Sequence, residues 1–551
     1  MGNKEAKFWA DSIADECIQR AEDDPKLKEI VKKKGYICYD EKTPSGRIHV
    51  GSGRGWIIHD AIAKALRDKG VKARFILSSD DMDPLDKMPN YLDREKYGKF
   101  MGVPFRDIPS PAGKGTFAKH YFFECTALFD EFGIEAELES TGQRYVDGDF
   151  NWAIRKVLDN ADKIKEIFEN LYDQPYDKLP FNVRCPECGK ISTTKVLEWD
   201  PDKEQVKFRC EKEMVDWAEG CGHEGWISPY DGNGKLPWKV EWAAKWPVVG
   251  VVCELAGKDH FTKGGSRTVS IQISDKVFDF PPPYPSTRKN IGKGYEFFTV
   301  GGKKMSTSKG HGIGFADIKD FIPPNLMRYL LVATRPRAMI DFNPEGKNDV
   351  VLLFERYDRT ERIYYGKETV SNESEDMQHK RIYELSHVGK IRDSMPVQIP
   401  FSFAAVIMQV TLDADKAVEK LREMGHIGSK ASGEDIYHVK DRLEYAHRWV
   451  KELAPEGFRF EFNEDIPEDL ELSEEQLSAL HALKDALKLK RWKEDELYEE
   501  FYNICENCGV KPGKFFQAAY RVLIGREKGP RLASFILTLG QEDVAELLEK
   551  L

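Results

Sequence analysis

The sequence lacks any long hydrophobic run. No stretch of about 18 apolar residues without charges occurs in it, so we expect no membrane-spanning helix and no membrane partner. Residues 1–6 also lack the apolar core of a secretory signal. We therefore expect a protein of the cytoplasm.

Cysteine is scarce, and an excess of positive charge is absent. The chain has 10 cysteines in 551 residues, several of them in CxxC pairs, which is typical of metal ligation in a reducing compartment rather than of a disulfide framework. Acidic residues outnumber basic ones by 94 to 83, giving a net charge of -11. A nucleic-acid partner would therefore have to bind through local basic patches. The length suggests about three or four domains, and we find no internal repeat.

Two short segments far apart in the chain carry the strongest functional pattern. Thr43–Ser52 follows an apolar run at Tyr36–Tyr39 and precedes a helical pattern at Trp56–Ala65. It therefore lies where a predicted strand ends and a helix begins, a place that favours anions. Lys304–Gly310 is a hydroxyl-rich loop with several lysines, which can close over phosphates. Together they predict a nucleotide held between a fixed site and a mobile cationic loop.

The two segments resemble the HIGH and KMSKS signatures of class I aminoacyl-tRNA synthetases. Trp9–Asp11, Ala256–His260 and Ile524–Phe535 further resemble the class I lysyl-tRNA synthetase, the form found mainly in archaea and some bacteria, and the resemblance runs through essentially the whole chain. It implies a lysine–tRNA ligase of protein biosynthesis, which activates lysine with ATP and Mg²⁺ to lysyl-adenylate. The lysine then passes to the 2′-hydroxyl of the terminal ribose of tRNA(Lys).

The patterns also predict an architecture of α/β class. Residues 36–110 read as strand, helix, strand, and Val248–Cys253 reads as a buried strand, so a Rossmann-like parallel sheet is split by an insertion. Lys367–Lys380 reads as a polar linker. Helical patterns then run to the end, with a capping box at Ser473 and Gln476. We expect a first Rossmann half with an N-terminal helix at 1–114, a zinc-bearing acceptor-end insertion at 115–237, a second Rossmann half at 238–300, the KMSKS loop with a connecting helical domain at 301–380, and an all-helical anticodon-binding domain at 381–551.

The predicted catalytic residues are His49, Lys304 and Lys309. Amino-acid activation needs no enzyme nucleophile, because the substrate carboxylate attacks the α-phosphate of ATP. It needs donors aimed at the charge that develops on phosphorus. His49 is suited to the α-phosphate, and the two lysines to the pyrophosphate that leaves. Each segment also has a simpler interpretation. The His49 segment can be an ordinary strand–turn–helix with an incidental histidine, and the lysine segment can be a plain solvated turn. Ser52 replaces the last histidine of HIGH, and Thr307 replaces the second lysine of KMSKS.

The resemblance also implies which residues bind ATP and the amino acid. For ATP these are Thr43, Ser45, Gly51, Ser52, Asp259, Met305, Ser306 and Ser308. For the substrate they are Trp238, His260, Tyr295 and, in the acidic run that ends a strand, Asp81. The competing interpretation of Trp238 is a core aromatic. Glu41 departs from the family, which usually has glycine there, so it either crowds the pocket or contacts the substrate ammonium directly.

The insertion carries a candidate structural zinc site. Cys185, Cys188, Cys210 and Cys221 supply four thiolates, opened by a CxxC pair, and such ligand sets favour tetrahedral zinc. His223 competes with Cys221 for the fourth position, and reduced buried thiols are the alternative to a metal. Cys505 and Cys508 form a second CxxC without a partner pair, which we interpret as packing.

The C-terminal region mixes bases with aromatic and glycine positions. Arg521, Arg526, Lys528 and Arg531 lie close together in sequence, and such patches contact RNA backbones, although a solvated loop between helices gives the same pattern. The resemblance makes a tRNA partner the expectation, for a chain that acts as a monomer. The two rivals are an adenylate-forming ligase of a small acid with no RNA partner, and a non-catalytic RNA-binding paralogue.

Overall fold

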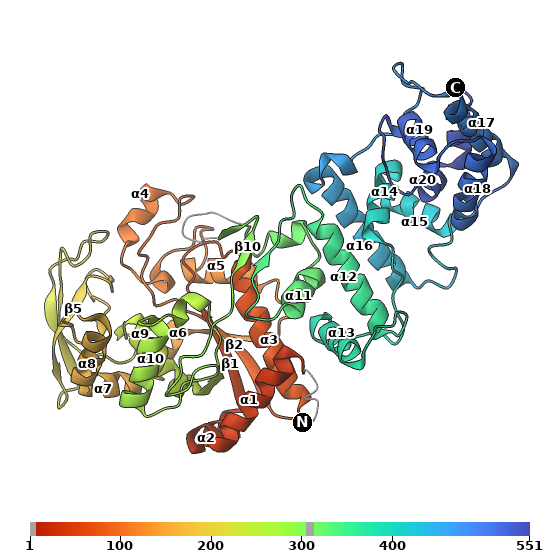
Figure 1. Cartoon of the computed structure of the whole chain (residues 1–551). Coiled ribbons are helices and arrows are strands. Elements are labelled where there is room, and N and C mark those ends of the chain that lie inside the picture. The colour runs from red at the N-terminus through yellow and green to blue at the C-terminus, as the bar shows by residue number, and fades with distance from the viewer. Residues whose placement is uncertain (1–6, 305–312) are drawn as a thin grey trace. The chain divides into compact units, whose positions relative to one another are not determined.

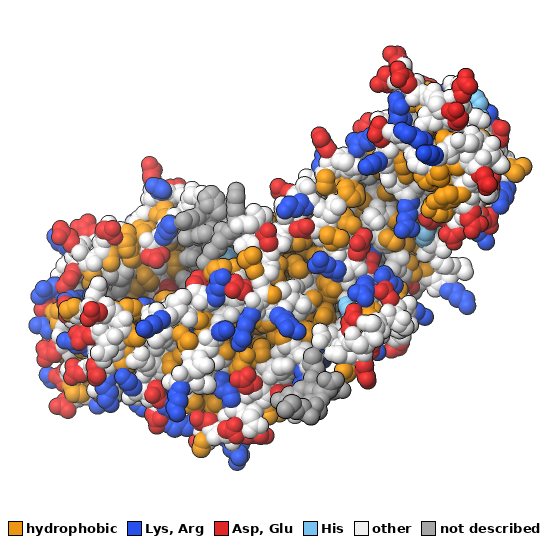
Figure 2. Space-filling view, viewed as in Figure 1, with side chains coloured by type: hydrophobic (Ala, Val, Ile, Leu, Met, Phe, Trp, Pro, Cys, Tyr) orange, Lys and Arg blue, Asp and Glu red, His pale blue; other side chains and the backbone are white. Residues whose placement is uncertain are grey.

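The computed structural model of the chain describes residues 7–304 and 313–551 and divides into two compact units. Unit 1 comprises Met1–Asp320, Pro324–Phe342 and Thr369–Ile391, and unit 2 comprises Phe321–Pro323, Asn343–Glu368 and Arg392–Leu551 (Figure 1). Among the described residues, no helix has both the length and the apolar character to cross a bilayer. Figure 2 shows acidic and basic side chains interspersed over the visible face, as the mixed composition predicts.

A four-stranded parallel sheet forms the centre of unit 1. Its strands are β1 (Tyr36–Lys42), β2 (Ala73–Ser79), β3 (Ala136–Ser140) and β9 (Val251–Cys253), in the spatial order β3-β2-β1-β9. Helix α3 (Gly53–Asp68) connects β1 to β2, so the predicted strand–helix–strand unit is confirmed. Because the chain turns from β1 toward β2 on one side and returns as β9 on the other, β1 stands at the point where the strand order reverses. Ligands bind outside the carboxyl ends of strands at such a point.

The predicted strand at Val248–Cys253 is only half a strand. β9 begins at Val251, while Trp246–Gly250 forms a wide π-helical turn that continues α9 (Trp238–Lys245). Gly250 ends this turn with a positive φ of 89°, and a Cβ there would meet Ile30 at 3.0 Å. An apolar run buried on all sides cannot be divided into helix and strand by periodicity alone, which is why the prediction was too long.

The linker predicted at Lys367–Lys380 is also wrong in part, because α13 (Glu373–Ser386) occupies most of it. The side chain of Asn372 accepts a hydrogen bond from the backbone N–H of Glu375 and so caps the helix. Acidic residues in its first turn favour the positive end of the helix dipole. Arg381 then ties the helix to Asp11 and Asp68 through ion pairs at 2.9 and 2.8 Å. The polar composition of this segment therefore belongs to a helix that ion pairs hold in place, and not to a linker.

The rest of unit 1 surrounds the sheet with short elements. Its N-terminal helices are α1 (Trp9–Asp23) and α2 (Pro25–Lys34), as predicted for this region. The insertion between β2 and β9 also carries a three-stranded antiparallel sheet, β5-β6-β7. The remaining elements are α4 (Arg94–Tyr97), α5 (Phe117–Thr126), α6 (Thr141–Val146), α7 (Asn151–Asp159), α8 (Ala161–Tyr172), β4 (Asn182–Val183), β5 (Thr194–Asp200), β6 (Gln205–Cys210), β7 (Glu224–Ile227), β8 (Gly234–Lys235), α10 (Ser266–Ile273), β10 (Phe298–Val300), β11 (Lys303–Lys304), α11 (Pro324–Ala333) and β12 (Ile340–Asp341).

Unit 2 is helical, as predicted for the C-terminal region. The predicted capping box at Ser473 and Gln476 opens α17 (Glu474–Leu489), whose Leu480, Leu483 and Leu487 are buried. The other helices are α12 (Asp349–Tyr364), α14 (Phe401–Thr411), α15 (Ala414–Glu423), α16 (Gly433–Arg448), α18 (Glu494–Asn507), α19 (Pro512–Ile524), α20 (Leu532–Leu539) and α21 (Gln541–Leu548). Cys505 lies buried on α18, where it packs in the helical core.

A buried ion pair joins α11 to the sheet layer of unit 1. The side chains of Arg328 and Asp60 are both fully buried, with Nη2 and Oδ2 2.6 Å apart. Arg328 also donates to the carbonyls of Phe132, Gly133 and Leu385. A single guanidinium therefore connects α11 with Asp60 and with two further segments of the chain. Asp60 accepts in addition from the backbone N–H of Glu135.

We predict that Arg328→Met lowers the free energy of unfolding by about 3–5 kcal/mol, because it leaves the Asp60 carboxylate buried without its cation. Urea denaturation followed by tryptophan fluorescence measures the change. Arg155→Met, which removes an exposed arginine, is the matched control and should change little. The double variant Arg328→Met/Asp60→Asn should recover part of the loss. Equal effects of Arg328→Met and Arg155→Met would contradict the role given to the buried pair.

Candidate active site

The loop Thr43–Ser52 leaves the carboxyl end of β1 and leads directly into α3. Val50–Ser52 forms a 3₁₀ turn, and α3 begins at Gly53. Ser52 stands at the cap position of α3, and its hydroxyl accepts no hydrogen bond from the helix amides. The N–H of Gly53 donates to the carbonyls of Val50 and Gly51 in the preceding turn, and the dipole of the 16-residue helix favours an anion near this end.

The chain that follows the lysine-rich segment is fastened to this loop. The backbone N–H of Val50 donates to Ile313 at 2.9 Å, that of Phe315 donates to Ile48 at 2.8 Å, and His49 bridges Gly314. The Phe315 ring fills the space beside Gly53, where a Cβ would meet it at 2.5 Å. These backbone contacts, here named the clamp, hold the histidine loop (Thr43–Ser52) against residues 313–315.

Ion pairs and a strand extend the clamp on both sides. Arg47 pairs with Asp317 and with Glu124, each at 2.8 Å. On the other side β11 (Lys303–Lys304) pairs antiparallel with β10, so Lys304 lies opposite Thr299. Lys304 thus ends a strand before the segment, while Met305, Ser306, Thr307, Ser308 and Lys309 lie outside the described residues. The predicted histidine loop and the flank that follows the predicted lysine segment are therefore neighbours in the fold.

An aromatic group lies beside the same end of the sheet. Trp238 and Trp242 lie one turn apart on α9, and the His260 ring contacts both at centroid distances of 5.8 and 5.3 Å. Burial lowers the pKa of His260, so its ring is neutral at pH 7. Trp238 keeps 42% of its surface exposed, which distinguishes it from a core aromatic. The structure thus brings two of the predicted substrate residues, Trp238 and His260, together.

Tyr295, a third predicted substrate residue, lies against α3 and the loop that carries His260. Its backbone N–H donates to Ala256 at 2.9 Å, and its carbonyl accepts from Lys258 at 3.0 Å. A Cβ at Gly55 would meet the Tyr295 hydroxyl at 2.8 Å and the Asp40 carboxylate at 2.6 Å, so only glycine fits between them. Burial raises the pKa of Tyr295, and the charge of Asp40 adds to this effect. Asp40 is a site acid that the sequence pattern did not single out.

Asp81 has a different environment from the aromatic group. Its carboxylate accepts hydrogen bonds from the Ser140 hydroxyl at 2.7 Å and from the backbone N–H of Gly142 at 2.8 Å. Ser140 is the last residue of β3, and Gly142 lies in the first turn of α6. Burial raises the pKa of Asp81, although these hydrogen bonds oppose the shift. The hydrogen bonds of the Asp81 carboxylate are thus with the junction of β3 and α6 and not with Trp238 or His260.

A buried group of six charged residues, here named the charge cluster, fills the carboxyl ends of β1 and β2. Lys235 lies 3.2 Å from Asp80 and 3.0 Å from Glu241, and it also binds Asp83. Lys245 lies 2.5 Å from both Glu41 and Glu241. The members are Glu41, Asp80, Asp83, Lys235, Glu241 and Lys245. Glu41 therefore contacts an ammonium of the chain itself, which is a third outcome beside the two that the sequence left open.

The cluster holds four carboxylates but only two lysines, so two negative charges remain unless protons bind. Burial, reinforced by the charge of Asp80, raises the pKa of Glu41 to about 8 and that of Asp83 to about 7. Burial acts the same way on Asp80, but Lys235 and Lys245 outweigh it and lower the pKa of that carboxyl. Both lysine pKa values are raised by the carboxylates despite burial. Glu41 and Asp83 are the carboxyl groups of the cluster whose pKa values are raised, so they are the ones that bind protons near neutral pH.

Four thiols gather in the insertion, as predicted. The sulfurs of Cys185 and Cys221 are 3.6 Å apart, those of Cys188 and Cys210 are 3.7 Å apart, and all four lie within 4.8 Å of one another. Cys221, not His223, belongs to this group; the ring of His223 instead contacts Phe208 at 5.7 Å. Among the described residues, Cys505 and Cys508 belong to no group of three or more potential metal ligands. Cys17, Cys38, Cys125 and Cys253 are buried.

Comparison with known proteins identifies the family. Residues 7–389 match the family described as "tRNA synthetases class I (K)", and residues 403–551 match the "Anticodon binding domain" family. The chain belongs to the class I tRNA synthetases. A class I tRNA synthetase is an aminoacyl-tRNA ligase that uses ATP.

Curated relatives match this synthetase over its full length. Proteins named "Lysine--tRNA ligase" from Methanosphaera stadtmanae and Methanocaldococcus jannaschii are 33% and 32% identical, covering 98% and 97% of the chain and 98% of each relative. The protein of the same name from Methanopyrus kandleri is 32% identical over 98% of the chain and 97% of its own length. A glutamate tRNA ligase of known structure from Elizabethkingia meningosepticum aligns over 94% of this chain and 98% of its own with 12% identity and a TM-score of 0.42, too low to support any argument.

Sequence reasoning missed most of the charge cluster in this synthetase. Glu241 and Lys245 are spaced four residues apart on α9, so the sequence does place them on one helix face. The remaining pairings join positions far apart in sequence: Lys245 binds Glu41, 204 residues away, and Lys235 binds Asp80, 155 residues away. No pattern in the nearby sequence predicts such a pairing. The sequence shows the acidic run Asp80–Asp83, but it does not show that Lys235 binds there.

We predict that the contribution of Glu41 and Asp83 to the stability of this synthetase is lost between about pH 4 and pH 8. Glu41 titrates near 4.5 when unfolded and near 8 when folded, and Asp83 near 3.8 and near 7, so the folded state holds protons that the unfolded chain releases. Their stabilisation is complete below the unfolded pKa values and falls progressively as the pH rises through the folded values of 7 and 8. Urea denaturation at several pH values measures it.

The double variant Glu41→Gln/Asp83→Asn should show a much flatter dependence over the same pH range, because neither side chain can then titrate. Glu166→Gln, which changes an exposed carboxylate on α8, is the control and should follow the parent protein. A double variant as pH-dependent as the parent would show that these two carboxyls do not hold the protons.

Proposed function

We propose that the chain is a lysine–tRNA ligase, which activates lysine with ATP to lysyl-adenylate and transfers the lysyl group to tRNA(Lys). The observation that carries the proposal is the backbone clamp between the His49 loop and residues 313–315, in a chain that matches relatives of this name end to end. The clamp joins a fixed anion site to the segment in which the lysines lie. Such a pairing suits transfer at the α-phosphate of ATP.

Within this reaction we assign the nucleotide to the end of β1 and the start of α3. His49 donates to the α-phosphate, and Lys304 and Lys309 neutralise the pyrophosphate as it leaves. Asp259, on the loop after β9, accepts from the ribose hydroxyls. The remaining ATP contacts are assigned to Thr43, Ser45, Gly51, Ser52, Met305, Ser306 and Ser308. Mg²⁺ accompanies the triphosphate, as it does in other phosphate-transfer enzymes.

We assign the amino acid to the aromatic group of Trp238, His260 and Tyr295, with Asp40 as the acid that meets an ammonium group of lysine. The carboxylates of the charge cluster already bind Lys235 and Lys245, whereas Asp40 forms no ion pair with a lysine or arginine among the described residues. Its nearest basic group is the His59 ring at 3.6 Å. We assign Asp81, which contacts Ser140 and Gly142, to the support of the junction of β3 and α6.

A structural zinc ion fits the four thiols of the insertion. Zinc–sulfur bonds of about 2.3 Å in a tetrahedron place sulfurs about 3.8 Å apart, close to the 3.6 and 3.7 Å of the two pairs. Four thiolate ligands leave no open position, so the ion would brace the insertion and not take part in chemistry. The ligands we propose are Cys185, Cys188, Cys210 and Cys221.

The remaining parts are assigned to the tRNA. We propose that residues 115–237 guide the acceptor end and that residues 381–551 read the anticodon, which the match to an anticodon-binding family supports. That match also disfavours an adenylate-forming ligase with no RNA partner. A non-catalytic paralogue is disfavoured because the histidine loop, its clamp and the lysines are all retained. The monomeric state and the cytoplasmic location stay predictions.

We predict that lysine alone among the twenty amino acids drives ATP–pyrophosphate exchange by the full chain. His49→Ala and Lys304→Ala should each lower the exchange rate by about 10²–10³, the cost of losing one donor to the transition state. Binding of tRNA should hardly change. His438→Ala, an exposed histidine of unit 2, is the control. Exchange driven by arginine or glutamate instead of lysine would refute the substrate assignment, and a fully active His49→Ala would remove that residue from its role.

We predict one zinc ion per chain in protein purified without added metal, measured by plasma mass spectrometry. Cys188→Ser should reduce the bound zinc because three thiolates bind it more weakly than four. The matched control is Cys508→Ser, which alters the CxxC pair at the end of α18 and should keep the metal. Full zinc content in Cys188→Ser would show that the four thiols are not the ligands.

A further inference from the structure

A buried carboxylate holds two tryptophans, one on α9 and one in the turn that continues it. Glu254 follows the last residue of β9 and is only 5% exposed. Its Oε2 atom accepts hydrogen bonds from the indole N–H of Trp242 at 2.7 Å and from that of Trp246 at 2.9 Å. It also accepts from the guanidinium of Arg267. Because three donors meet at one oxygen, the two indole rings have fixed orientations relative to the end of β9.

Arg267 balances the charge of this carboxylate. It is fully buried on α10, and its remaining nitrogens donate to the Ser286 hydroxyl at 3.0 Å and to the Pro283 carbonyl at 3.1 Å. Its guanidinium also lies 4.8 Å from the centroid of the Trp246 ring. These contacts fix the arginine, and the pair that it forms with Glu254 has no net charge. The pair can therefore orient the rings without presenting a charge to a ligand.

Trp242 passes this orientation on to Trp238 and His260, which we assign to the amino acid. The Trp242 ring stacks on that of Trp238, with centroids 5.8 Å apart and planes at 23°, and it lies 5.3 Å from the His260 ring at an interplanar angle of 88°. Both are geometries that aromatic pairs prefer. The loop that leads to His260 also begins at Glu254. One carboxylate thus fixes both the helix and the loop that bring Trp238 and His260 together.

Trp246 makes the same hydrogen bond in a different setting. It is fully buried at the start of the π-helical turn. In the described part of the chain, its ring contacts neither Trp238 nor His260. The two tryptophans therefore share one acceptor, but only Trp242 connects that acceptor to the residues assigned to the amino acid.

We infer that Glu254 is a positioning residue for the amino-acid site and acts through the indole of Trp242. The inference rests on the proposed function and deepens it, since it says what sets the geometry of the assigned pocket. A ring whose N–H is held by a buried carboxylate cannot rotate without losing that hydrogen bond, which is costly. Trp242 therefore keeps Trp238 and His260 at a constant separation for the amino acid. Loss of the hydrogen bond weakens the binding of lysine and leaves the binding of ATP nearly unchanged.

Trp242→Phe tests the hydrogen bond directly, because phenylalanine keeps an aromatic ring but has no N–H. Calorimetric titration of the full chain gives Kd for lysine and for ATP, and charging of tRNA(Lys) gives KM for lysine. The lysine Kd and KM should rise by roughly 10-fold, the factor that one hydrogen bond to a charged group contributes. The ATP Kd should stay near the parent value. The matched control is Trp246→Phe, which removes an N–H from the same oxygen and should bind lysine like the parent.

Two double variants separate the acceptor from the charge. Glu254→Gln/Arg267→Met removes both charges but keeps a carbonyl that accepts the indole N–H, so it should bind lysine nearly as the parent does. Glu254→Leu/Arg267→Met removes the acceptor as well and should bind lysine as weakly as Trp242→Phe. Both variants lack the ion pair, so a role confined to the stability of the core would affect their lysine affinities equally.

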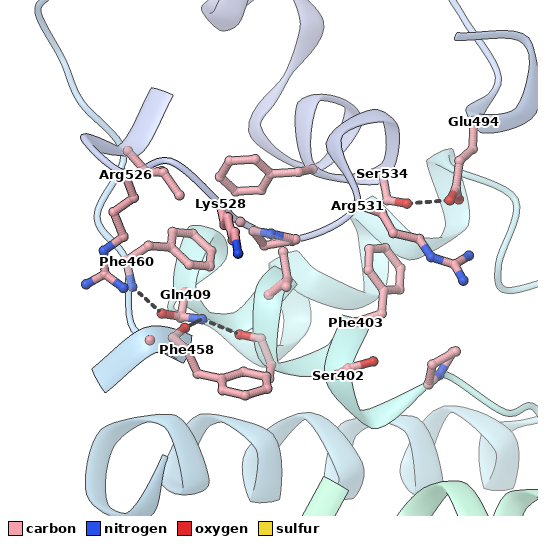
Figure 3. A pocket seen from close by; sticks show the side chains of 18 of the residues that line it. Ser402, Phe403, Gln409, Phe458, Phe460, Glu494, Arg526, Lys528, Arg531 and Ser534 are labelled. Carbon is pink, nitrogen blue, oxygen red and sulfur yellow. Dashed lines mark hydrogen bonds between the residues drawn. The ribbon is translucent and has the colours of Figure 1, made fainter. Parts of the chain in front are cut away.

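A glutamine of unit 2 provides a control for lost stability. Gln409 lines a cavity of about 600 Å³ (Figure 3). Its side chain donates to the carbonyls of Ala405 and Phe458 and accepts from the backbone N–H of Phe460. Gln409→Leu breaks these three hydrogen bonds, so it should lower the midpoint of urea denaturation and leave the lysine Kd unchanged.

Equal lysine affinities of Trp242→Phe and Trp246→Phe would overturn the inference, as would equal affinities of the two double variants. If a double variant does not fold, the two single variants decide the question. A parent chain that neither binds lysine nor charges tRNA with it would instead refute the proposed function, because every comparison is made against the parent.

Discussion

The pairing of two buried lysines with four carboxylates is the constraint on which the geometry of unit 1 depends. Lys235 and Lys245 bring together the ends of β1 and β2, strand β8 and helix α9, which are distant in sequence. If either lysine lost its partners, buried charges would remain without an opposite charge, which is strongly destabilising. Since α9 also carries Trp238 and Trp242, the same pairing sets where the aromatic group stands against the sheet. The Thr43 hydroxyl donates to Asp83 at 3.3 Å and so connects the cluster to the loop that carries His49.

Strand alternation explains how one strand serves two purposes. Neighbouring side chains of β1 point to opposite faces of the sheet. Glu41 accordingly reaches Lys245 and the Thr141 hydroxyl in the charge cluster. Asp40 instead reaches the other face, where Gly55, His59 and Tyr295 surround it. Both side chains lie near the carboxyl end of β1, where the strand order reverses and where ligands bind in such sheets. Glu41 is thus paired with a lysine, whereas Asp40 forms no ion pair with a lysine or arginine among the described residues.

The elements that the sequence predicts well are those with a local cause. The β1–α3–β2 unit follows from periodicity, and the cap of α17 follows from Ser473 and Gln476 three residues apart. The thiol group follows from CxxC spacing, although geometry was needed to choose Cys221 over His223. The failures have different causes. Helix α13 has a local signal, the cap of Asn372 on Glu375, which the polar composition masked, and its ion pairs from Arg381 to Asp11 and Asp68 are long-range. The pairing of Glu41 with Lys245 spans 204 residues and is not recognisable from nearby residues.

Calorimetric titration of the full chain with lysine tests the central division between Asp40 and Glu41 most directly. We predict that Asp40→Asn weakens lysine binding by roughly 10-fold or more, as expected when a charged hydrogen bond is lost. Glu41→Gln, which alters the adjacent carboxylate of the charge cluster, should change lysine affinity only slightly. The opposite result, strong loss in Glu41→Gln and near-normal affinity in Asp40→Asn, would show that the charge cluster and not Asp40 meets the substrate ammonium.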